Sequence, residues 1–232
     1  MAVSTDRVYQ KVLALANKEQ RGYITPQEFN LFADQAQMEI FDQYFYDLNQ
    51  FKRQPGKNIK YSDTVSFIEE KIAIFKSTKS VTNGLYGGVF PYKIDSIYDT
   101  GSNSSTACVV EEINQMKATA IQSSPLTKAT SKRPVYYTSN RSLFFIPEIA
   151  VGTYTANIIL RPKIPIWPYS IVNTTAMYNP GSANSQNFEL HPSEENNLVV
   201  KILQLSGVAM KDYQLAQVAS QVEMKNTQQE KQ

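Results

Sequence analysis

Hydrophobic and polar positions follow three successive patterns along the chain. Apolar residues recur at helical spacing over residues 1–76, and they return to that spacing over residues 193–230. Between these stretches, residues 85–178 alternate apolar and polar positions between turn signals. Helices and strands that are segregated in this way predict an α+β fold. The expected regions are an N-terminal helical region at 1–83, a β-rich insertion at 84–187, and a C-terminal helix and tail at 188–232.

The second predicted helix has the clearest start signal in the chain. Thr25 occupies the N-cap, Pro26 the first helical position and Glu28 the third, which together form a capping box. The helix is predicted to run to about Arg53. Its apolar residues cover an arc of about 220°, which is wider than the roughly 100° that one packing face needs, so we expect contacts beyond its own core. This arc consists of Phe29, Phe32, Ala36, Ile40, Phe41, Tyr44, Phe45, Leu48 and Phe51.

Three further helices are predicted from spacing and capping residues. The first begins at Thr5 and ends near Gly22, and the third covers about Asp63 to Lys76. The last begins at Pro192, with two acidic residues in its first turn, where the helix dipole favours them. Asp212 is expected to cap a further segment of this helix, whose apolar positions are Leu215, Val218 and Val222.

The middle of the chain predicts short strands joined by turns. The expected strands are 93–98, 107–111, 135–138, 143–146 and 153–160, and a short helix is expected near 112–121. Trp167, the only tryptophan, stands between two prolines, which favours an extended connection over residues 164–168. Residues 170–187 are predicted to be irregular.

Charge, cysteine and histidine content exclude several classes of protein. The 232 residues include 23 Lys and Arg against 21 Asp and Glu, so the chain lacks the strong positive charge of a dedicated nucleic-acid-binding protein. The single cysteine, Cys108, excludes an intramolecular disulfide, and the single histidine, His191, excludes metal motifs that need two. We expect no signal peptide over residues 1–10 and no membrane span, since no run of about 18 apolar residues occurs.

Few side chains suggest catalytic chemistry. Glu39 and Asp42 lie three residues apart on the second helix and would share a cation there, although acidic residues on a helix surface are usually only solvated. His191 has no sequence partner and directly precedes a proline, which favours a structural role over a general base. Cys108 lies in an apolar strand, which favours a buried small hydrophobic residue over a nucleophile. We therefore expect no enzyme, no catalytic residue, no cofactor and no metal.

Two other features indicate binding. Residues Lys128–Tyr137 mix basic and aromatic side chains, a pattern found in proteins that bind single-stranded nucleic acid. The neutral amides Asn and Gln number 34, and abundant amides with few charges suit polar protein interfaces, as they also suit ordinary surface coverage. Together with the wide apolar arc, they favour a protein–protein interface.

Motifs in three parts of the chain carry a resemblance to a known family. They are Tyr23–Asn30 and Gln35–Phe41, then Ser124–Lys128, Arg133–Tyr137, Leu143–Pro147 and Leu160–Trp167, and finally Phe188–Pro192 with Gly207–Asp212. In this order they resemble head-to-tail connector or adaptor ring proteins of tailed phages. The N-terminal motifs resemble structural proteins of crAss-like and related phages, and the middle motifs resemble the β-insertion of phage adaptors. The organisation is similar to that of podovirus tail tubular protein A and head-completion adaptors.

The resemblance implies a fold and a set of partners. In that family the N- and C-terminal helices form a bundle, an antiparallel β-rich domain is inserted between them, and a homo-oligomeric ring, by resemblance a dodecamer, continues the portal channel. The implied partners are the portal protein, the next tail or connector ring, and DNA that passes without sequence recognition, with no membrane involved. The implied location is the phage virion, at the neck or tail, after synthesis in the bacterial host cytoplasm.

Candidate contact residues follow from this reading. Part of the wide arc, at Phe41, Phe45 and Phe51, is expected to contact a neighbouring subunit. The C-terminal arm is expected to contact the portal through Asp212, Leu215, Val218 and Val222. Three alternatives stay open: another ring or tail-tube component of the connector, an intracellular phage protein that binds nucleic acid through Lys128–Tyr137, and a small hydrolase or metal enzyme that uses Glu39, Asp42 or His191.

Overall fold

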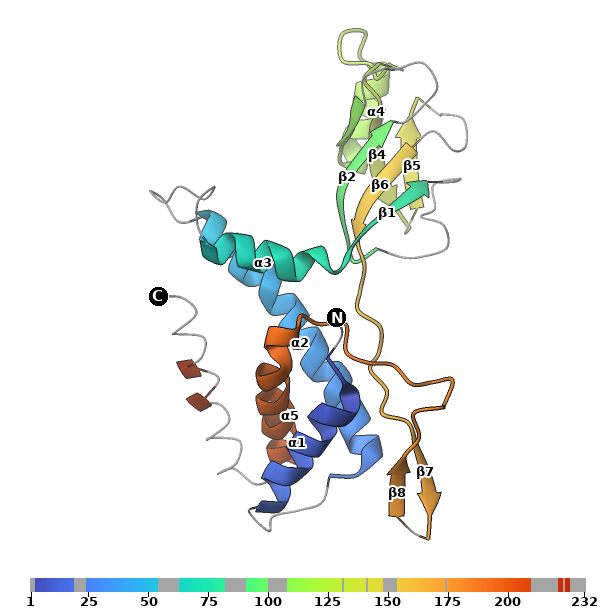
Figure 1. Cartoon of the computed structure of the whole chain (residues 1–232). Coiled ribbons are helices and arrows are strands. Elements are labelled where there is room, and N and C mark those ends of the chain that lie inside the picture. The colour runs from blue at the N-terminus through green and yellow to red at the C-terminus, as the bar shows by residue number, and fades with distance from the viewer. Residues whose placement is uncertain are drawn as a thin grey trace. The chain divides into compact units, whose positions relative to one another are not determined.

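A computed structural model describes most of the chain. The described residues are 3–18, 24–53, 63–81, 91–99, 108–130, 132–140, 142–147, 154–173, 175–209, 221–222 and 224–225. The chain forms two compact units (Figure 1). One comprises Met1–Ile74 with Pro162–Gln232 and is called the helical unit here; the other comprises Phe75–Arg161 and is called the β unit.

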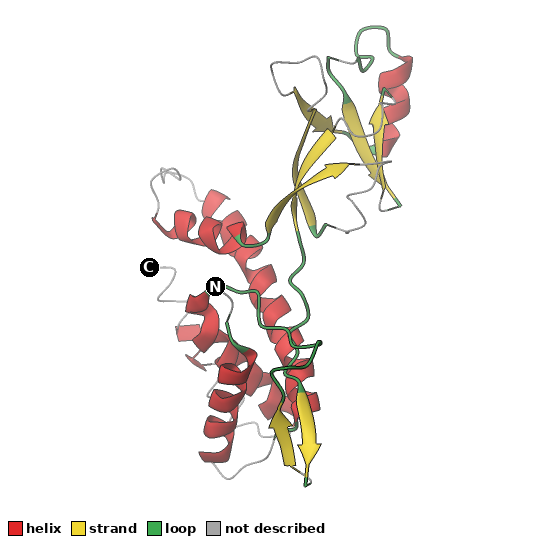
Figure 2. Ribbon diagram, turned by 45° about the vertical axis from the view of Figure 1, so that its right-hand side comes forward, coloured by secondary structure: helices red, strands yellow, loops and turns green. Residues whose placement is uncertain are grey.

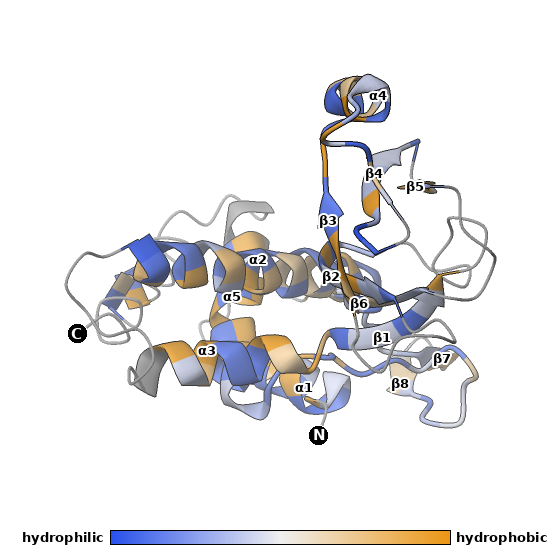
Figure 3. Cartoon of the chain, turned by 90° about the horizontal axis from the view of Figure 1, so that it is seen from above, coloured by the Kyte–Doolittle hydropathy of each residue, from blue (hydrophilic) through white to orange (hydrophobic). Residues whose placement is uncertain are grey.

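Helices dominate the helical unit. Helix α5 packs against both α1 and α2, and α3 packs against α2. Hydrophobic and hydrophilic positions are interleaved along these helices (Figure 3), as expected of helices that are buried on one side only. The elements are α1 (Thr5–Lys18), α2 (Pro26–Arg53), α3 (Asp63–Ala73), the short 3-10 helix η2 (Pro192–Glu194) and α5 (Glu195–Ala209).

The predicted capping box at the start of α2 is confirmed. The Glu28 N–H donates to Thr25 Oγ1 at 3.3 Å, and the Thr25 N–H donates to Glu28 Oε2 at 3.0 Å. The Thr25 hydroxyl also donates to Glu28 Oε2, at 2.8 Å. These hydrogen bonds favour the ionised carboxylate, so they lower the pKa of Glu28 below its ordinary value.

The β unit contains one six-stranded sheet with the order β1-β6-β2-β3-β4-β5. Its strands, yellow in Figure 2, pair antiparallel except for β3 and β4, which run parallel, so the expectation of an antiparallel β domain is corrected at this point. The reason is the connection: parallel neighbours need a crossover, and helix α4 (Gln115–Ser123) supplies it. The strands are β1 (Lys76–Val81), β2 (Lys93–Asp99), β3 (Cys108–Glu112), β4 (Val135–Ser139), β5 (Ser142–Ile146) and β6 (Tyr154–Ile159).

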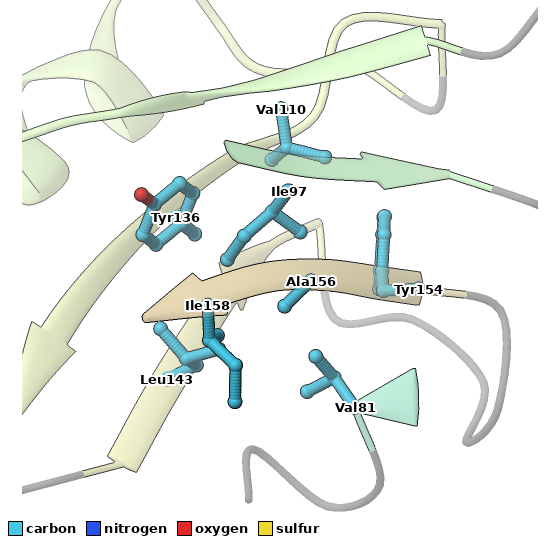
Figure 4. Close-up of a cluster of buried hydrophobic side chains, with 8 residues drawn as sticks. All are labelled: Val81, Ile97, Val110, Tyr136, Leu143, Tyr154, Ala156 and Ile158. Atoms are coloured by element: carbon cyan, nitrogen blue, oxygen red, sulfur yellow. The ribbon is translucent and has the colours of Figure 1, made fainter. Parts of the chain in front are cut away.

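The sheet curls around its own core. Val81 on β1 and Leu143 on β5 come from opposite ends of the strand order, yet both belong to one cluster of buried side chains (Figure 4). Between them lie Ile97, Val110, Tyr136, Tyr154, Ala156 and Ile158. A second, smaller cluster joins Ala118 of α4 to Val135 and Ile146, so α4 covers the other face of β4 and β5.

The α+β class predicted from the sequence is confirmed. The helices and the strands of the middle region lie where spacing placed them, within a few residues. Two parts differ from expectation. Strand β1 lies inside the region expected to be helical and pairs with β6. The residues expected to be irregular contain a two-stranded hairpin, β7 (Tyr169–Val172) and β8 (Thr175–Tyr178), which belongs to the helical unit.

Candidate assembly surface

Three phenylalanines of α2 were expected to contact a neighbouring subunit, and the structure encloses one of them. Phe41 is 0% exposed and packs edge-on against Phe45, with ring centroids 5.1 Å apart. Phe45 and Phe51 are half-buried. Because Phe41 is fully enclosed by its own chain, it presents no surface to another subunit, and the expectation for this residue is corrected.

The wide apolar arc of α2 has an explanation within the chain. Its buried residues lie under other parts of the helical unit, namely α5, α3 and an extended segment of residues 162–168. The arc therefore does not by itself indicate a second partner. The buried residues of this helix are Pro26, Phe29, Ala33, Ala36, Gln37, Ile40, Phe41 and Tyr44.

Two amide side chains of α2 hold the extended segment along the helix. The Gln37 side chain donates to the Lys163 carbonyl at 2.8 Å and accepts from the Glu189 N–H at 3.1 Å. The Asn30 side chain accepts from the Trp167 N–H at 2.8 Å and donates to the Trp167 carbonyl at 3.3 Å. Asn30 thus bonds the segment as a neighbouring strand's peptide group would, and Gln37 joins the segment to the backbone at Glu189.

Trp167 fixes the end of that segment to the helices. Its indole N–H donates to Asp6 Oδ1 at 3.0 Å, and its ring lies against Tyr9, with centroids 4.3 Å apart. On the hairpin side, Tyr169 and Tyr178 stack on the same indole at 6.0 and 5.6 Å. Trp167 is therefore the link between α1, α2 and the base of the hairpin.

The hairpin beyond this base exposes apolar side chains. Figure 1 shows β7 and β8 as a separate pair of arrows beside the helices of their unit, and they form a sheet of only two strands. Ile171 is 72% exposed, Met177 55% and Val172 47%. Cross-strand pairing places Ile171 opposite Ala176, and Val172 opposite Thr175. A rigid base thus carries an apolar and exposed two-stranded tip.

Sequence reasoning missed this site for a physical reason. The prolines around Trp167 correctly predicted an extended segment, but its partners lie far away in the chain. Asn30 is separated from Trp167 by 137 residues and Asp6 by 161. The only local signal was a lone tryptophan in a proline-flanked segment that contains no helix pattern.

The predicted portal contact lies mostly outside the described residues. Asp212, Leu215 and Val218 are not among those residues, so their roles stay predictions. Val222 is described and exposed.

The residues considered for catalysis have structural partners. Glu39 Oε2 is 3.4 Å from Lys201 Nζ, and Glu39 Oε1 accepts from Gln35. His191 caps η2 through Nδ1, which accepts from the Ser193 N–H at 3.2 Å. Asp42 is exposed on α2. Within the described ranges, no three His, Cys, Asp or Glu side chains gather in a group that could hold a metal ion.

Cys108 and the basic-aromatic segment lie in the β unit. The Cys108 thiol donates to the Lys132 carbonyl at 3.2 Å and is half-buried, so the expectation of a buried residue holds only in part. The Arg133 guanidinium pairs with Glu111 at 3.0 Å. Tyr137 stacks on Phe144, with centroids 5.2 Å apart and an interplanar angle of 14°.

Comparison with known proteins adds no family. No protein-family model matches the chain. A search of curated proteins likewise finds no match. Among the described residues, no helix has both the length and the apolarity that crossing a bilayer requires.

Proposed function

We propose that the chain is a non-enzymatic structural protein of a phage virion. It forms a ring that joins the portal to the tail and continues the DNA channel, through which the genome is retained and then ejected. The N- and C-terminal helices of the helical unit form the bundle of this ring. The subunit number expected by resemblance is twelve, and the next tail or connector ring is the further partner.

The observation that carries the proposal is the hairpin anchored by Trp167. Exposed apolar side chains that cluster on a soluble surface mark sites of association. On the two short strands of the hairpin, the exposed side chains of Val172 and Met177 share one face, and that of Ile171 lies on the other. Their base is held by hydrogen bonds from two helices, so little order has to be gained on binding. These features suit a subunit that is built for assembly.

Charge supports the role of a conduit. The formal net charge is +2, and a wall with little net charge does not hold the DNA backbone electrostatically. DNA would pass without sequence recognition. The C-terminal segment that contains Asp212, Leu215, Val218 and Val222 is proposed to contact the portal, and Phe45 and Phe51 stay candidates for the subunit contact.

Native mass tests the proposal. The full chain is measured by native mass spectrometry or light scattering, alone and with the portal protein of the same genome. We expect a large assembly of fixed stoichiometry in at least one of the two conditions. A chain that is monomeric in both conditions and does not bind the portal would overturn the proposal. An assembly that forms without affinity for the portal would favour another ring or tail-tube component.

A second candidate function rests on the exposed aromatic pair of the β unit. Bases of single-stranded nucleic acid stack on exposed aromatic rings beside cations. Phe144 is exposed and stacks on Tyr137, and Lys128 and Lys132 are exposed in the preceding segment. This function predicts binding of a single-stranded oligonucleotide that weakens with rising salt and is lost in Phe144→Ala. Absence of binding at low salt would exclude it.

A further inference from the structure

Within the part of the chain that the structure describes, no other strand pairs with either edge of the β7–β8 hairpin. In an antiparallel pair, residues that exchange two backbone hydrogen bonds alternate with residues whose N–H and C=O groups point outward. The bond from the Asn179 N–H to the Pro168 carbonyl, at 3.0 Å, fixes the phase of this alternation. Ile171 and Ala176 then form an outward-pointing pair, one on each edge. Among the described residues, no hydrogen bond outside the hairpin reaches either backbone group.

The hairpin itself contains none of the charges, prolines or bulges that often protect an edge strand. Exposed edges in natural proteins carry lysines, prolines, bulges or a covering element, because an open row of N–H and C=O groups otherwise recruits another strand. Residues 169–178 contain no charged residue and no proline. Four strand residues from each side pair in continuous register, without a bulge. The edges are therefore competent for addition of another strand.

The absence of charge around the hairpin limits the chemistry of the strand that can pair with it. Residues 164–188 are 25 consecutive residues without a charged side chain, in a chain that has 23 Lys and Arg and 21 Asp and Glu. A nucleic acid finds no cation there to contact its phosphates. A strongly charged protein surface would have to leave its charges unpaired against this segment. The matching partner is an uncharged and partly apolar strand, and the chain itself supplies one in the same hairpin of a second copy.

We propose that the β7–β8 hairpin joins neighbouring copies of this chain by strand addition, with the β8 edge of one copy paired to the β7 edge of the next. The two open edges differ, so pairing one with the other is head-to-tail, and this is the kind of contact that closes into a ring. This inference rests on the proposed ring function, whose neighbouring-subunit contact it locates at Ile171 and Ala176. The exposed side chains of Val172 and Met177 lie on the same strands and add apolar contact across the joint.

Proline substitution tests the backbone pairing at each edge separately. Ile171→Pro removes the outward N–H of β7, and Ala176→Pro removes that of β8, while the hydrogen bonds inside the hairpin stay in place. Ile171→Thr is the matched control, since it keeps the N–H and the β-branched shape. Val109→Thr is a second control, because Val109 is a similarly exposed strand residue of the β unit. A proline at this position would not serve, because β3 is an inner strand and would lose its own pairing. The fluorescence of Trp167 reports whether each variant keeps the hairpin base intact.

Native mass is measured under the condition that assembles the wild-type chain. Each proline variant alone is expected to lose assembly, whereas both threonine variants keep it. An equal mixture of the two proline variants is expected to give a one-to-one dimer, because the intact β8 edge of the first still pairs with the intact β7 edge of the second. Loss in only one proline variant would overturn the head-to-tail arrangement.

Other outcomes separate this inference from the proposed function. If both proline variants keep the fluorescence of Trp167 and assemble as the wild type does, the ring function stands and strand addition is refuted. If the wild-type chain never assembles, alone or with the portal, the proposed function fails. If the proline variants still self-assemble but no longer bind the portal, the hairpin binds the portal rather than a second copy, and the inference is refuted.

Discussion

The buried ion pair between Lys71 and Glu194 offers the sharpest test of how the helical unit is held together. Lys71 Nζ and Glu194 Oε1 are 2.5 Å apart, and their side chains are 8% and 3% exposed. The Lys71 ammonium also lies over the Phe67 ring, 4.6 Å from its centroid, and Asn197 donates to the second Glu194 oxygen at 2.7 Å. The pair therefore connects α3 to η2, directly before α5, across a region from which water is excluded.

Removal of one charge leaves the other buried without its partner. Lys71→Met is expected to lower the free energy of unfolding by about 3–5 kcal/mol, which is a large part of the roughly 5–15 kcal/mol of a typical domain. Glu194→Leu is expected to have a similar effect. The double variant is expected to lose far less than the sum of the two, because apolar residues of similar volume replace a buried pair at little or no cost.

Urea unfolding followed by tryptophan fluorescence measures the free energy of unfolding of the helical unit. Trp167 is the only tryptophan and belongs to the helical unit, so its signal does not report the β unit. Lys52→Met is the matched control: Lys52 of α2 and Glu69 of α3 likewise form an ion pair between two elements of this unit, but they are 3.9 Å apart and 48% and 54% exposed. That exposed pair contributes at most about 1 kcal/mol. Equal losses for Lys71→Met and Lys52→Met, or strict additivity in the double variant, would refute the reasoning.

Three further predictions concern other parts of the chain. Burial raises the pKa of both Tyr136 and Tyr154 to about 12. These tyrosines therefore do not change the stability of the β unit below pH 10, and they lower it as pH rises from 10 toward 12, because only the unfolded chain then ionises them. Tyr136→Phe should make the melting temperature, followed by circular dichroism, less sensitive to alkali. Thr25→Ala should lower the stability of the helical unit by about 1 kcal/mol. Because the pKa of Glu28 is lowered, its stabilising effect is present above about pH 4.5 and lost in acid. Thr25→Ala should remove this acid dependence in urea titrations. Unchanged acid sensitivity in the variant would contradict the role given to the capping box. Asn30→Asp replaces an amide donor with an oxygen that faces the Trp167 carbonyl, so it should lower the free energy of unfolding by about 1–3 kcal/mol and alter the tryptophan emission. Emission identical to the wild type would contradict the role of Asn30 in holding Trp167.

Local signals predicted the elements whose causes are local. The start of α2 was readable because Thr25, Pro26 and Glu28 stand within four residues of one another, and the capping box forms between them. The strands of the β unit were readable from alternation and turns. The hairpin of residues 169–178 was not, because each strand has only four residues and its serine, asparagine and threonine residues resemble a loop.

Inference from the arc of α2 failed where burial depended on distant sequence. Nine apolar residues on one helix suggested a partner outside the chain, but much of the arc is covered by α5 and by the segment around Lys163. Gln37 shows the difficulty most clearly. A glutamine in the middle of a helix predicts an exposed position, yet this one is fully buried, because both of its polar atoms bond to backbone groups more than 120 residues away.

The same two amides affect the inference that was drawn from the high content of Asn and Gln. Asn30 and Gln37 are seven residues apart, so they lie on one face of α2. Asn30 pairs with the N–H and the carbonyl of Trp167, and Gln37 pairs with the Lys163 carbonyl and the Glu189 N–H. Without these amides, those backbone groups would lose their partners. Abundant amides therefore do not by themselves indicate an interface, since these two serve the interior of a single chain. Their effect on assembly is indirect: because the segment that ends in Trp167 is fixed to α2 at two points, the hairpin that follows it begins from a fixed base, and only its edges and exposed side chains remain for a neighbour.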